Sequence, residues 1–295
     1  MSSVHDRPFR FGVAVFTPST RAEWVSKVRV AEELGYDVVS VSDHLGMPAP
    51  VPTLLLAAEA TQRIRIGTLV LNTSFYNPTL LARDIATVDR FSGGRVELGL
   101  GAGYDKAQFD AAGLPWIAAG ERVSHLERTV AEFRKPRAQL DQYARFDQPS
   151  GPPILIAGRG ERVLRLAAKH ADIIAFTGTT KVSDGDGLKL GGLAEVTGRI
   201  ELVRELLGDR VDDVEFNIPL HRVLPAGKTG GITDVWQNPL DFGADELAEL
   251  PSILIGTPEE GADKLRDRRK TLGLTYYTVL ESEMEAFAPI IEALR

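Results

Sequence analysis

The sequence predicts a single (β/α)8 barrel of the TIM type, formed by residues 1–295 as one domain, with insertion loops at its carboxyl-terminal face. Eight strand-like segments alternate with helical ones, and no break in composition divides the chain. This alternation is typical of a parallel sheet covered by helices, and 295 residues suit one closed barrel. A doubly wound open sheet is the alternative. The expected strands are residues 11–16, 37–42, 64–71, 96–100, 152–157, 172–176, 214–220 and 275–280.

The stretch 63–105 has the pattern of a βαβ unit. Its first strand, residues 64–71, is an apolar run of the kind that is buried on both faces of a sheet. Asn77 and Pro78 predict a helix start, because asparagine caps the first amides and proline already has a helical φ. A pair of glycines ends this helix, and residues 96–100 alternate through a second strand. Such a unit closes right-handed onto a parallel sheet.

Other helix starts carry equally local signals. Thr20 with Glu23, and Thr257 with Glu260, have the spacing of a capping box. Residues 179–192 and the weakly periodic segment 224–250 are expected to be loops without regular structure. The expected helices are residues 20–34, 52–62, 78–92, 121–133, a segment around Val163 to Ala167, 193–207 and 257–272.

Composition excludes several classes of function. The net charge of −7 argues against a general nucleic-acid or anionic-membrane binder. The chain has no cysteine, which excludes disulfides, thiolate catalysis and cysteine-based metal sites. The start MSSVHDRPFRF lacks the apolar region of a signal peptide, and no run is long enough to span a membrane. We therefore expect a cytoplasmic enzyme.

The barrel places candidate site residues at the carboxyl ends of the strands, where such barrels bind their ligands. Three of these ends are rich in glycine, which lets a backbone approach a ligand closely. The long segments 102–120, 179–192 and 224–250 leave the same ends, as substrate lids do. The strand-end candidates are His44, the residues from Leu69 to Asn72, those from Gly101 to Asp105, those from Gly158 to Gly160, and Thr177 with Gly178.

Several segments together resemble the bacterial luciferase-like monooxygenase superfamily, in particular its branch that uses coenzyme F420, an 8-hydroxy-5-deazaflavin. The matching segments cover nearly the whole chain in order. They are ELGYDVVSVSDHL, IRIGTLVL, NPTLLARDIATVDRFSGGRVELGLGAGYD, PPILIAGRGERVLRLAAKHADII and ILIGTPEEGADKLRDRRKTLG. The resemblance implies a TIM-type barrel that binds a flavin or deazaflavin at its carboxyl-terminal face, often as a homodimer.

The resemblance also assigns roles to particular residues. Asp43 and His44 match the catalytic strand-end pair beside the cofactor ring. Leu69 and Val70 fall where F420-using members have a non-prolyl cis peptide behind that ring. The cofactor-binding positions implied further along the chain are Gly101, Ala102 and Gly103 near the ring, Ala157, Gly158, Arg159 and Gly160 at the phosphate-bearing tail, and Thr177 with Gly178 at the neighbouring strand end.

Two departures from the family pattern stand out. Tyr104 occupies the position where some F420 dehydrogenases carry a glutamate proton donor, which puts a sugar-phosphate dehydrogenase role in doubt. The segment between Phe133 and Pro152 is shorter than usual, so the pocket rim there cannot be inferred.

Each site also has a plainer interpretation. Asp43 and His44 could be a capping pair at a strand end, because polar residues there often satisfy backbone groups. The glycines at 99, 101 and 103 could fit a crowded barrel layer. Arg159, Arg162 and Lys181 could be ordinary surface cations, although the amides of residues 160–163 favour an anion beside the first two.

The other histidines give no sign of a metal site. His125, His170 and His221 lie in or beside regular elements and are expected to be structural. No two histidines have metal-ligand spacing, so we predict no metal.

The sequence thus predicts an F420-dependent oxidoreductase that moves a hydride to or from a small organic substrate. An FMN-dependent monooxygenase is the alternative within the enzyme class. A flavin-binding relative that has lost catalysis is the alternative outside it, and it would have a pocket blocked by apolar side chains near His44. The substrate itself is not readable, because the segments that would select it have the weakest patterns.

Overall fold

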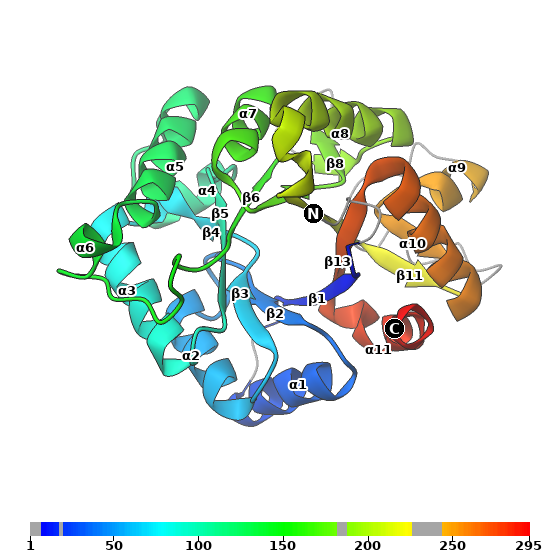
Figure 1. Ribbon diagram of the computed structural model, residues 1–295, viewed down its shortest axis with the longest axis horizontal. Coiled ribbons are helices and arrows are strands. Elements are labelled where there is room, and N and C mark those ends of the chain that lie inside the picture. Colours follow the sequence, from blue (N-terminus) through cyan, green and yellow to red (C-terminus); the bar gives the residue numbers. More distant parts are fainter. Residues whose placement is uncertain (1–6, 18–19, 182–187, 226–243) are drawn as a thin grey trace.

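A computed structural model describes residues 7–17, 20–181, 188–225 and 244–295. Its central feature is a closed ring of parallel strands surrounded by helices (Figure 1). The strands follow the order β3-β2-β1-β13-β10-β7-β6-β5-β4, and a further pairing of β3 with β5 closes the ring. The open-sheet alternative is therefore wrong. The strands are β1 (Arg10–Val15), β2 (Val38–Val41), β3 (Arg65–Thr68), β4 (Leu71–Asn72), β5 (Val96–Gly101), β6 (Ile154–Gly158), β7 (Ile173–Phe176), β10 (Glu215–Leu220) and β13 (Leu274–Leu280).

β3 and β4 occupy one place in the ring, because both pair with β5 and only two residues separate them. With these two counted together, the ring has the eight positions of a (β/α)8 barrel. Each of the eight predicted strands is confirmed, with ends that differ by a few residues. The last strand, β13, pairs with the first through Arg10 opposite Tyr276.

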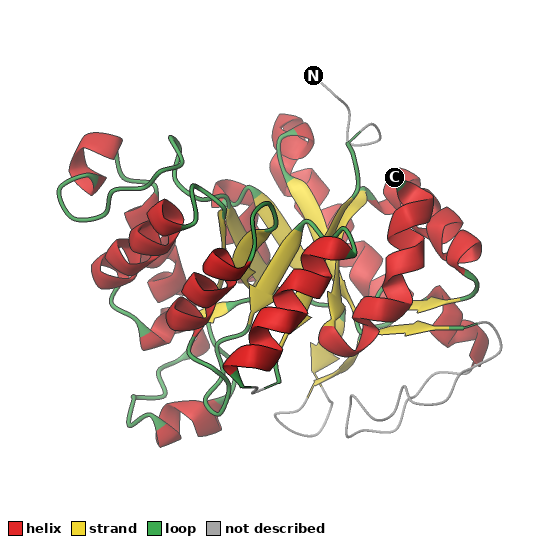
Figure 2. Cartoon of the chain, turned by 90° about the horizontal axis from the view of Figure 1, so that it is seen from below, coloured by secondary structure: helices red, strands yellow, loops and turns green. Residues whose placement is uncertain are grey.

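The helices form the outer layer, and Figure 2 shows them packed against the strands. Their starts follow the local signals: capping boxes form at Thr20 and Thr257, and Asn77 accepts hydrogen bonds from two amides of the following turn. The main helices are α1 (Arg21–Glu33), α2 (Pro50–Ala60), α3 (Pro78–Phe91), α5 (Ala119–Phe133), α7 (Glu161–His170), α8 (Leu193–Leu207), α10 (Pro258–Leu272) and α11 (Met284–Leu294). None of the described helices is long and apolar enough to cross a membrane.

Both segments expected to be loops contain regular structure in their described parts. In the first segment, β8 (Thr179–Lys181) and β9 (Leu188–Leu190) form an antiparallel pair. In the second segment, residues 244–249 form the short helix α9, and β11 (Arg222–Leu224) at the start of the segment pairs in parallel with β12 (Ile253–Ile255), which follows the segment. Strands of three residues are too short to show a period, which is why the pattern missed them. Residues 182–187 and 226–243 lie outside the described part. The other short elements are α4 (Lys106–Ala111), α6 (Arg137–Leu140), α9 (Ala244–Glu249) and the 3₁₀ turns η2 (Thr73–Phe75), η3 (Gly208–Asp212) and η4 (Glu281–Glu283).

The amino-terminal end of the barrel is closed by ionic contacts. Arg10 donates hydrogen bonds of 2.5 Å to both Glu97 and Glu215, and its guanidinium lies 4.5 Å from the ring centre of Tyr276. The charges of Arg10, Glu97 and Glu215 are therefore paired with one another within the protein and do not bind a ligand. The amino end of the barrel thus has the character of a stabilising layer.

The segment 134–153 also lies at this end, because it joins the end of α5 to the start of β6. Its Gln148 accepts a hydrogen bond from Arg65 at the start of β3 and donates one to the carbonyl of Val96 at the start of β5. The shorter length of this segment therefore does not alter the carboxyl-terminal rim.

Candidate active site

Strand pairing brings the predicted strand ends into one continuous arc. Val41 lies opposite Thr68, Asn72 opposite Gly101, and Gly158 opposite Phe176. β5 also pairs with β6, so that the ends of β2, β3 with β4, β5, β6 and β7 follow one another around the rim. The predicted cofactor-binding residues are the ones that stand at or just after these ends.

Apolar side chains form the floor of this arc. Leu69, Val70 and Ala157 are partly buried and pack on a cluster of the buried residues Val38, Leu155, Ile173, Ala175 and Tyr276. The Ser42 hydroxyl donates a hydrogen bond of 2.9 Å to the carbonyl of Leu69 and ties the floor to β2. The peptide bond between Leu69 and Val70 is cis, as the family resemblance implied. This floor offers an apolar surface to a flat ring.

The glycines of β5 are explained by crowding against this floor. A Cβ on Gly99 would lie 1.9 Å from the carbonyl oxygen of Thr68, and one on Gly101 would lie 2.7 Å from Val70 Cγ2. Gly103 has a φ of +75°, and its Cβ would lie 2.4 Å from Asn72 Oδ1. The plainer interpretation, that these glycines fit a crowded barrel layer, is therefore supported. Because these positions are glycines, no side chain projects from the strand ends where a ligand would lie.

The Asp43 carboxylate is used to hold the neighbouring strand end. It accepts a hydrogen bond of 3.0 Å from the backbone N–H of Asn72, and the Tyr76 hydroxyl also bonds to it. Burial raises the pKa of the Asp43 carboxyl, and these two hydrogen bonds offset the increase only in part. These contacts make Asp43 a residue that fixes the position of Asn72.

His44 has two ordered neighbours from the segment after β5. Its Nδ1 lies 2.6 Å from Gln108 Nε2, and its ring meets that of Tyr104 edge to face at a centre-to-centre distance of 6.0 Å. His44 itself is partly exposed and Tyr104 is 54% exposed, so His44 is not sealed beneath apolar side chains. Burial, then the nearby Asp105, raise the pKa of the Tyr104 phenol, while Arg159 lowers it. The ring nitrogen Nε2 of His44 has no hydrogen-bond partner among the described residues.

Sequence reasoning did not single out Gln108. The signal was present, because Asp105 and Gln108 have the three-residue spacing of a helix capping box. In the structure Asp105 caps α4 through a 3.0 Å hydrogen bond from the amide of Ala107, and Gln108 donates back to its carboxylate at 2.8 Å. Gln108 thereby connects the helix cap to His44.

Arg159 is the best-placed group for an anion. Its side chain is partly buried and makes no hydrogen bond or ion pair with the described residues. Burial lowers the pKa of Arg159 and the nearby Arg199 lowers it further, while Tyr104 and Glu195 offset part of the decrease. Arg199 is already paired with Glu195 at 2.6 Å, so Arg159 is the guanidinium that a bound anion would stabilise.

The start of α7 adds backbone donors beside this arginine. Gly160 precedes the helix without a side-chain cap, and a Cβ there would meet no atom within 4 Å. The open amides at a helix start and the helix dipole favour an anion at this point. Arg162 is turned away to bond with Ser124 Oγ at 2.8 Å, and the side chain of Lys181 lies outside the described part.

Thr177 and Gly178 lie beside a buried histidine. His221 Nε2 lies 3.3 Å from the carbonyl oxygen of Thr177, and Gly178 has a φ of +65°. Burial lowers the pKa of His221 to about 4, so the ring is neutral at pH 7. His221 thus has the structural role that the sequence predicted.

His125 and His170 make contacts of a structural kind. His125 Nε2 lies 3.0 Å and 3.1 Å from the carbonyl oxygens of Thr73 and Tyr76, and His170 ends α7. Across the described residues, no group of three His, Asp or Glu side chains could hold a metal ion.

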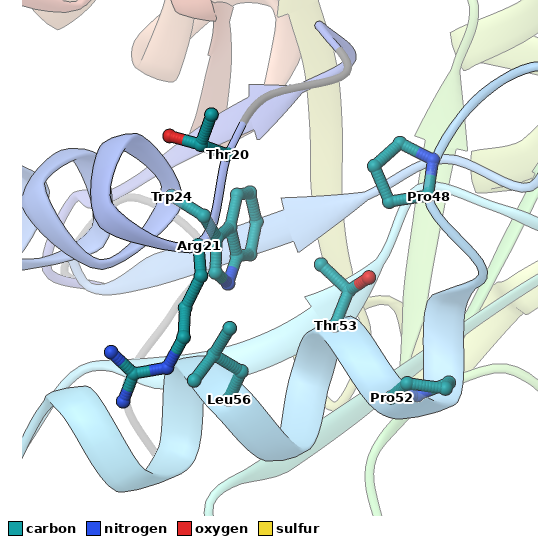
Figure 3. Close-up of a pocket in the computed structure, with 7 residues that line it drawn as sticks. All are labelled: Thr20, Arg21, Trp24, Pro48, Pro52, Thr53 and Leu56. Carbon is teal, nitrogen blue, oxygen red and sulfur yellow. The ribbon is translucent and has the colours of Figure 1, made fainter.

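A separate pocket lies on the outside of the barrel between α1 and α2 (Figure 3). It has a volume of about 250 Å³, and the indole of Trp24 forms part of its wall. Its other lining residues are Thr20, Arg21, Pro48, Pro52, Thr53 and Leu56. None of the predicted site residues lines it, so this pocket is distinct from the arc of strand ends.

Residues 7–185 match the family model described as luciferase-like monooxygenase. The chain is 32% identical over 277 residues to an F420-dependent glucose-6-phosphate dehydrogenase from Intrasporangium calvum, covering 80% of this chain and 82% of that protein. It is 29% identical over 171 residues to a 5,10-methylenetetrahydromethanopterin reductase from Archaeoglobus fulgidus, covering 55% and 51%. Its fold is similar to that of a coenzyme F420 dependent tetrahydromethanopterin reductase from Methanopyrus kandleri, with a TM-score of 0.73, 17% identity and coverage of 98% and 100%.

Proposed function

The chain belongs to the luciferase-like monooxygenase family, and from this premise we propose that it is an oxidoreductase that uses coenzyme F420 to move a hydride to or from a small organic substrate. The single structural observation that carries the choice of cofactor is Arg159, a half-buried cation beside the start of α7 that makes no hydrogen bond or ion pair with the described residues. The relative from Intrasporangium calvum supports the same choice, because it is an F420-dependent dehydrogenase.

The residues present fit such a cofactor. Leu69, Val70 and Ala157 provide an apolar floor for the ring, while Arg159 and the amides after Gly160 provide donors for the phosphate-bearing tail. When bound, a deazaflavin supplies two-electron hydride chemistry at its ring. The protein then has to hold the ring flat against the floor, keep water away from it and stabilise charge on the substrate.

His44 is the residue that we assign to the substrate. A neutral imidazole beside the ring can polarise an oxygen atom of the substrate or hold a proton while hydride passes. Asp43 contributes by keeping Asn72 and the end of β4 in place, and is a positioning residue in this proposal.

Tyr104 bears on the kind of substrate. The glutamate that some F420 dehydrogenases carry at this position is absent, and the phenol has a raised pKa that makes it a poor proton donor at pH 7. We therefore propose a small organic substrate other than a sugar phosphate. The exposed edge of Tyr104 is available to contact it.

The test is a parallel titration of the purified protein with F420, FMN and FAD at matched ionic strength. F420 should bind most tightly, and its affinity should weaken with added salt because the negative charge of its tail is screened. Tighter binding of FMN than of F420 would overturn the assignment and favour the FMN-dependent monooxygenase. Tight F420 binding with no hydride transfer to any carbonyl or imine compound tested would favour the inactive binding relative.

Three further features belong to the same proposal. We propose that residues 1–295 form one domain, since strands from the whole length close one barrel. We also propose that the enzyme works in the cytoplasm.

The third feature is a homodimer. It is supported by two large apolar side chains on α3, Leu80 and Phe91, which are 51% and 75% exposed. Sedimentation of the purified protein tests this state, and a monomer at micromolar concentration would contradict it.

A further inference from the structure

We propose that Gln108 is a positioning residue that holds His44 as a neutral imidazole with its proton on Nε2, so that His44 acts on the substrate by donating a hydrogen bond and keeps its proton. This inference rests on the proposed function for the identity of the reaction. The arrangement of Gln108 itself does not depend on the cofactor.

The orientation of the Gln108 amide is fixed from two sides. The backbone N–H of Leu45 donates a hydrogen bond of 3.0 Å to Gln108 Oε1, and a backbone N–H can only donate. On the other side, the Asp105 carboxylate accepts a hydrogen bond of 2.8 Å from Gln108 Nε2. Reversing the amide would set two donors against each other at Leu45 and two acceptors against each other at Asp105. The NH2 group must therefore face Asp105.

The same NH2 group faces His44 Nδ1 at 2.6 Å. An amide nitrogen of this kind donates and does not accept, so Nδ1 must carry the lone pair. In a neutral imidazole the proton then resides on Nε2. Protonation of Nδ1 would place an N–H against the Gln108 NH2 group, so this contact also disfavours the imidazolium form.

Gln108 is held firmly enough to impose this choice. It precedes Phe109, whose ring is fully buried and contacts Trp116 and Phe75 at centre-to-centre distances of 4.8 Å and 5.3 Å. The aromatic contacts fix α4, and α4 fixes Gln108. The ring of Tyr104, at an angle of 73° to that of His44, further limits rotation of the imidazole.

The consequence is a specific role for His44. With Nδ1 occupied and Nε2 protonated, the ring cannot take a proton from an alcohol, and giving away its single proton would leave an imidazolate anion. It can donate a hydrogen bond to a carbonyl oxygen of the substrate while hydride adds to the carbonyl carbon, and the alkoxide that forms then takes its proton from solvent. A neutral histidine that polarises an oxygen in this way is an established catalytic device.

The experiment compares Gln108→Glu with a matched control, Gln142→Glu, which makes the same change on an exposed residue of the segment at the amino end of the barrel. In Gln108→Glu, one carboxylate oxygen still accepts from Leu45, while the other faces the Asp105 carboxylate as well as Nδ1 and so favours a proton on Nδ1. Nitrogen NMR of protein labelled with ¹⁵N-histidine reads the protonation of each ring nitrogen. The chain has five histidines, and loss of a signal in His44→Gln assigns the His44 resonances.

For the wild-type protein without cofactor we expect His44 Nδ1 to be unprotonated and Nε2 protonated at pH 7.5. Gln108→Glu should move the proton to Nδ1 or protonate both nitrogens, and Gln142→Glu should leave the His44 signals unchanged. A protonated Nδ1 of His44 in the wild-type protein overturns the proposal even if both Gln108 variants misfold. This readout needs no bound F420, so its failure is distinct from failure of the proposed cofactor.

Kinetics provide the second readout. With F420 and a substrate accepted by the wild-type enzyme, Gln108→Glu should lower kcat at least tenfold while KM changes by less than threefold. Gln108→Ala should have a smaller effect on kcat, because it frees the tautomer without reversing it. Equal kcat values for Gln108→Glu and the wild-type enzyme would show that the tautomer has no bearing on the reaction and would overturn the catalytic part of the proposal.

Discussion

The carboxylate of Asp43 accepts a 3.0 Å hydrogen bond from the backbone N–H of Asn72 and so joins the end of β2 to the end of β4. β3 pairs with β2 and shares one place in the ring with β4, and the chain between β3 and β4 contains the cis peptide of the site floor. One side chain therefore spans the part of the rim on which a ring would rest.

We expect Asp43→Ala to lower the free energy of unfolding by about 1–3 kcal/mol, because the Asn72 amide loses a partner that it cannot replace within the protein. Asp43→Asn keeps an acceptor oxygen and should lose less than about 1 kcal/mol. Urea denaturation of both variants measures the difference. Equal losses in the two variants would remove the positioning role of Asp43.

Gly103→Ala should be more destabilising than Gly113→Ala. Both glycines have positive φ, +75° and +67°, so both substitutions carry the cost of that conformation, about 1 kcal/mol. Only at Gly103 would the new Cβ meet a neighbour, Asn72 Oδ1 at 2.4 Å, while the space around Gly113 is open. We expect an additional loss of about 1–3 kcal/mol for Gly103→Ala, measured by thermal or urea unfolding. If the two variants are equally stable, Asn72 yields easily and the turn is not crowded.

Most of the barrel was predictable from the sequence because its signals are local. Apolar runs gave the eight strands, and Asn77 and Thr257 marked helix starts that the structure places at the expected residues. The three-residue strands were missed, since β8 and β9 are stabilised by pairing with each other rather than by a periodic pattern.

The candidate site was predictable in its position but not in its contacts. Strand ends meet at one face of a barrel, so residues such as His44 and Gly101 could be named from their place after a strand. The contact between Gln108 and His44 joins residues 64 positions apart, and its geometry depends on the packing of Phe109. No short-range pattern encodes such a contact.

Arg159→Gln should weaken F420 binding about tenfold at low ionic strength, since it removes a charge-assisted contact to the anionic tail. The dependence of affinity on salt should also become shallower. The matched control is Arg90→Gln, which removes an exposed arginine from the last turn of α3 at the other end of the barrel. Fluorescence titration at two salt concentrations measures both effects. Identical affinities for the Arg159 and Arg90 variants would return Arg159 to an ordinary surface role.

His44→Ala should lower turnover about 10²–10⁴-fold while changing F420 affinity much less, because the imidazole acts on the substrate rather than on the cofactor tail. His170→Ala, at the end of α7, is the control and should retain wild-type turnover. Steady-state kinetics together with a cofactor titration separate the two quantities. Unchanged turnover in His44→Ala would favour the capping interpretation of the strand end.

Stability should fall as the pH is lowered from about 6.5 towards 4, and His221 should account for part of the fall. The ring is buried, and its pKa is lowered from 6.5 to about 4 in the folded protein. Between these values the unfolded chain binds more protons than the folded one, so the free energy of unfolding rises with pH through this window and is fully regained above it.

The expected contribution is about 2 kcal/mol lost between pH 7.5 and pH 5. His221→Gln removes the titrating group but keeps an N–H in the region of Nε2, which faces the carbonyl of Thr177. Urea denaturation of the two proteins at both pH values isolates this contribution, because the other titrating groups are common to both and cancel in the difference. The wild-type protein should lose about 2 kcal/mol more than the variant on acidification. A variant that loses as much as the wild-type protein would show that His221 is protonated as readily in the folded chain as in the unfolded one.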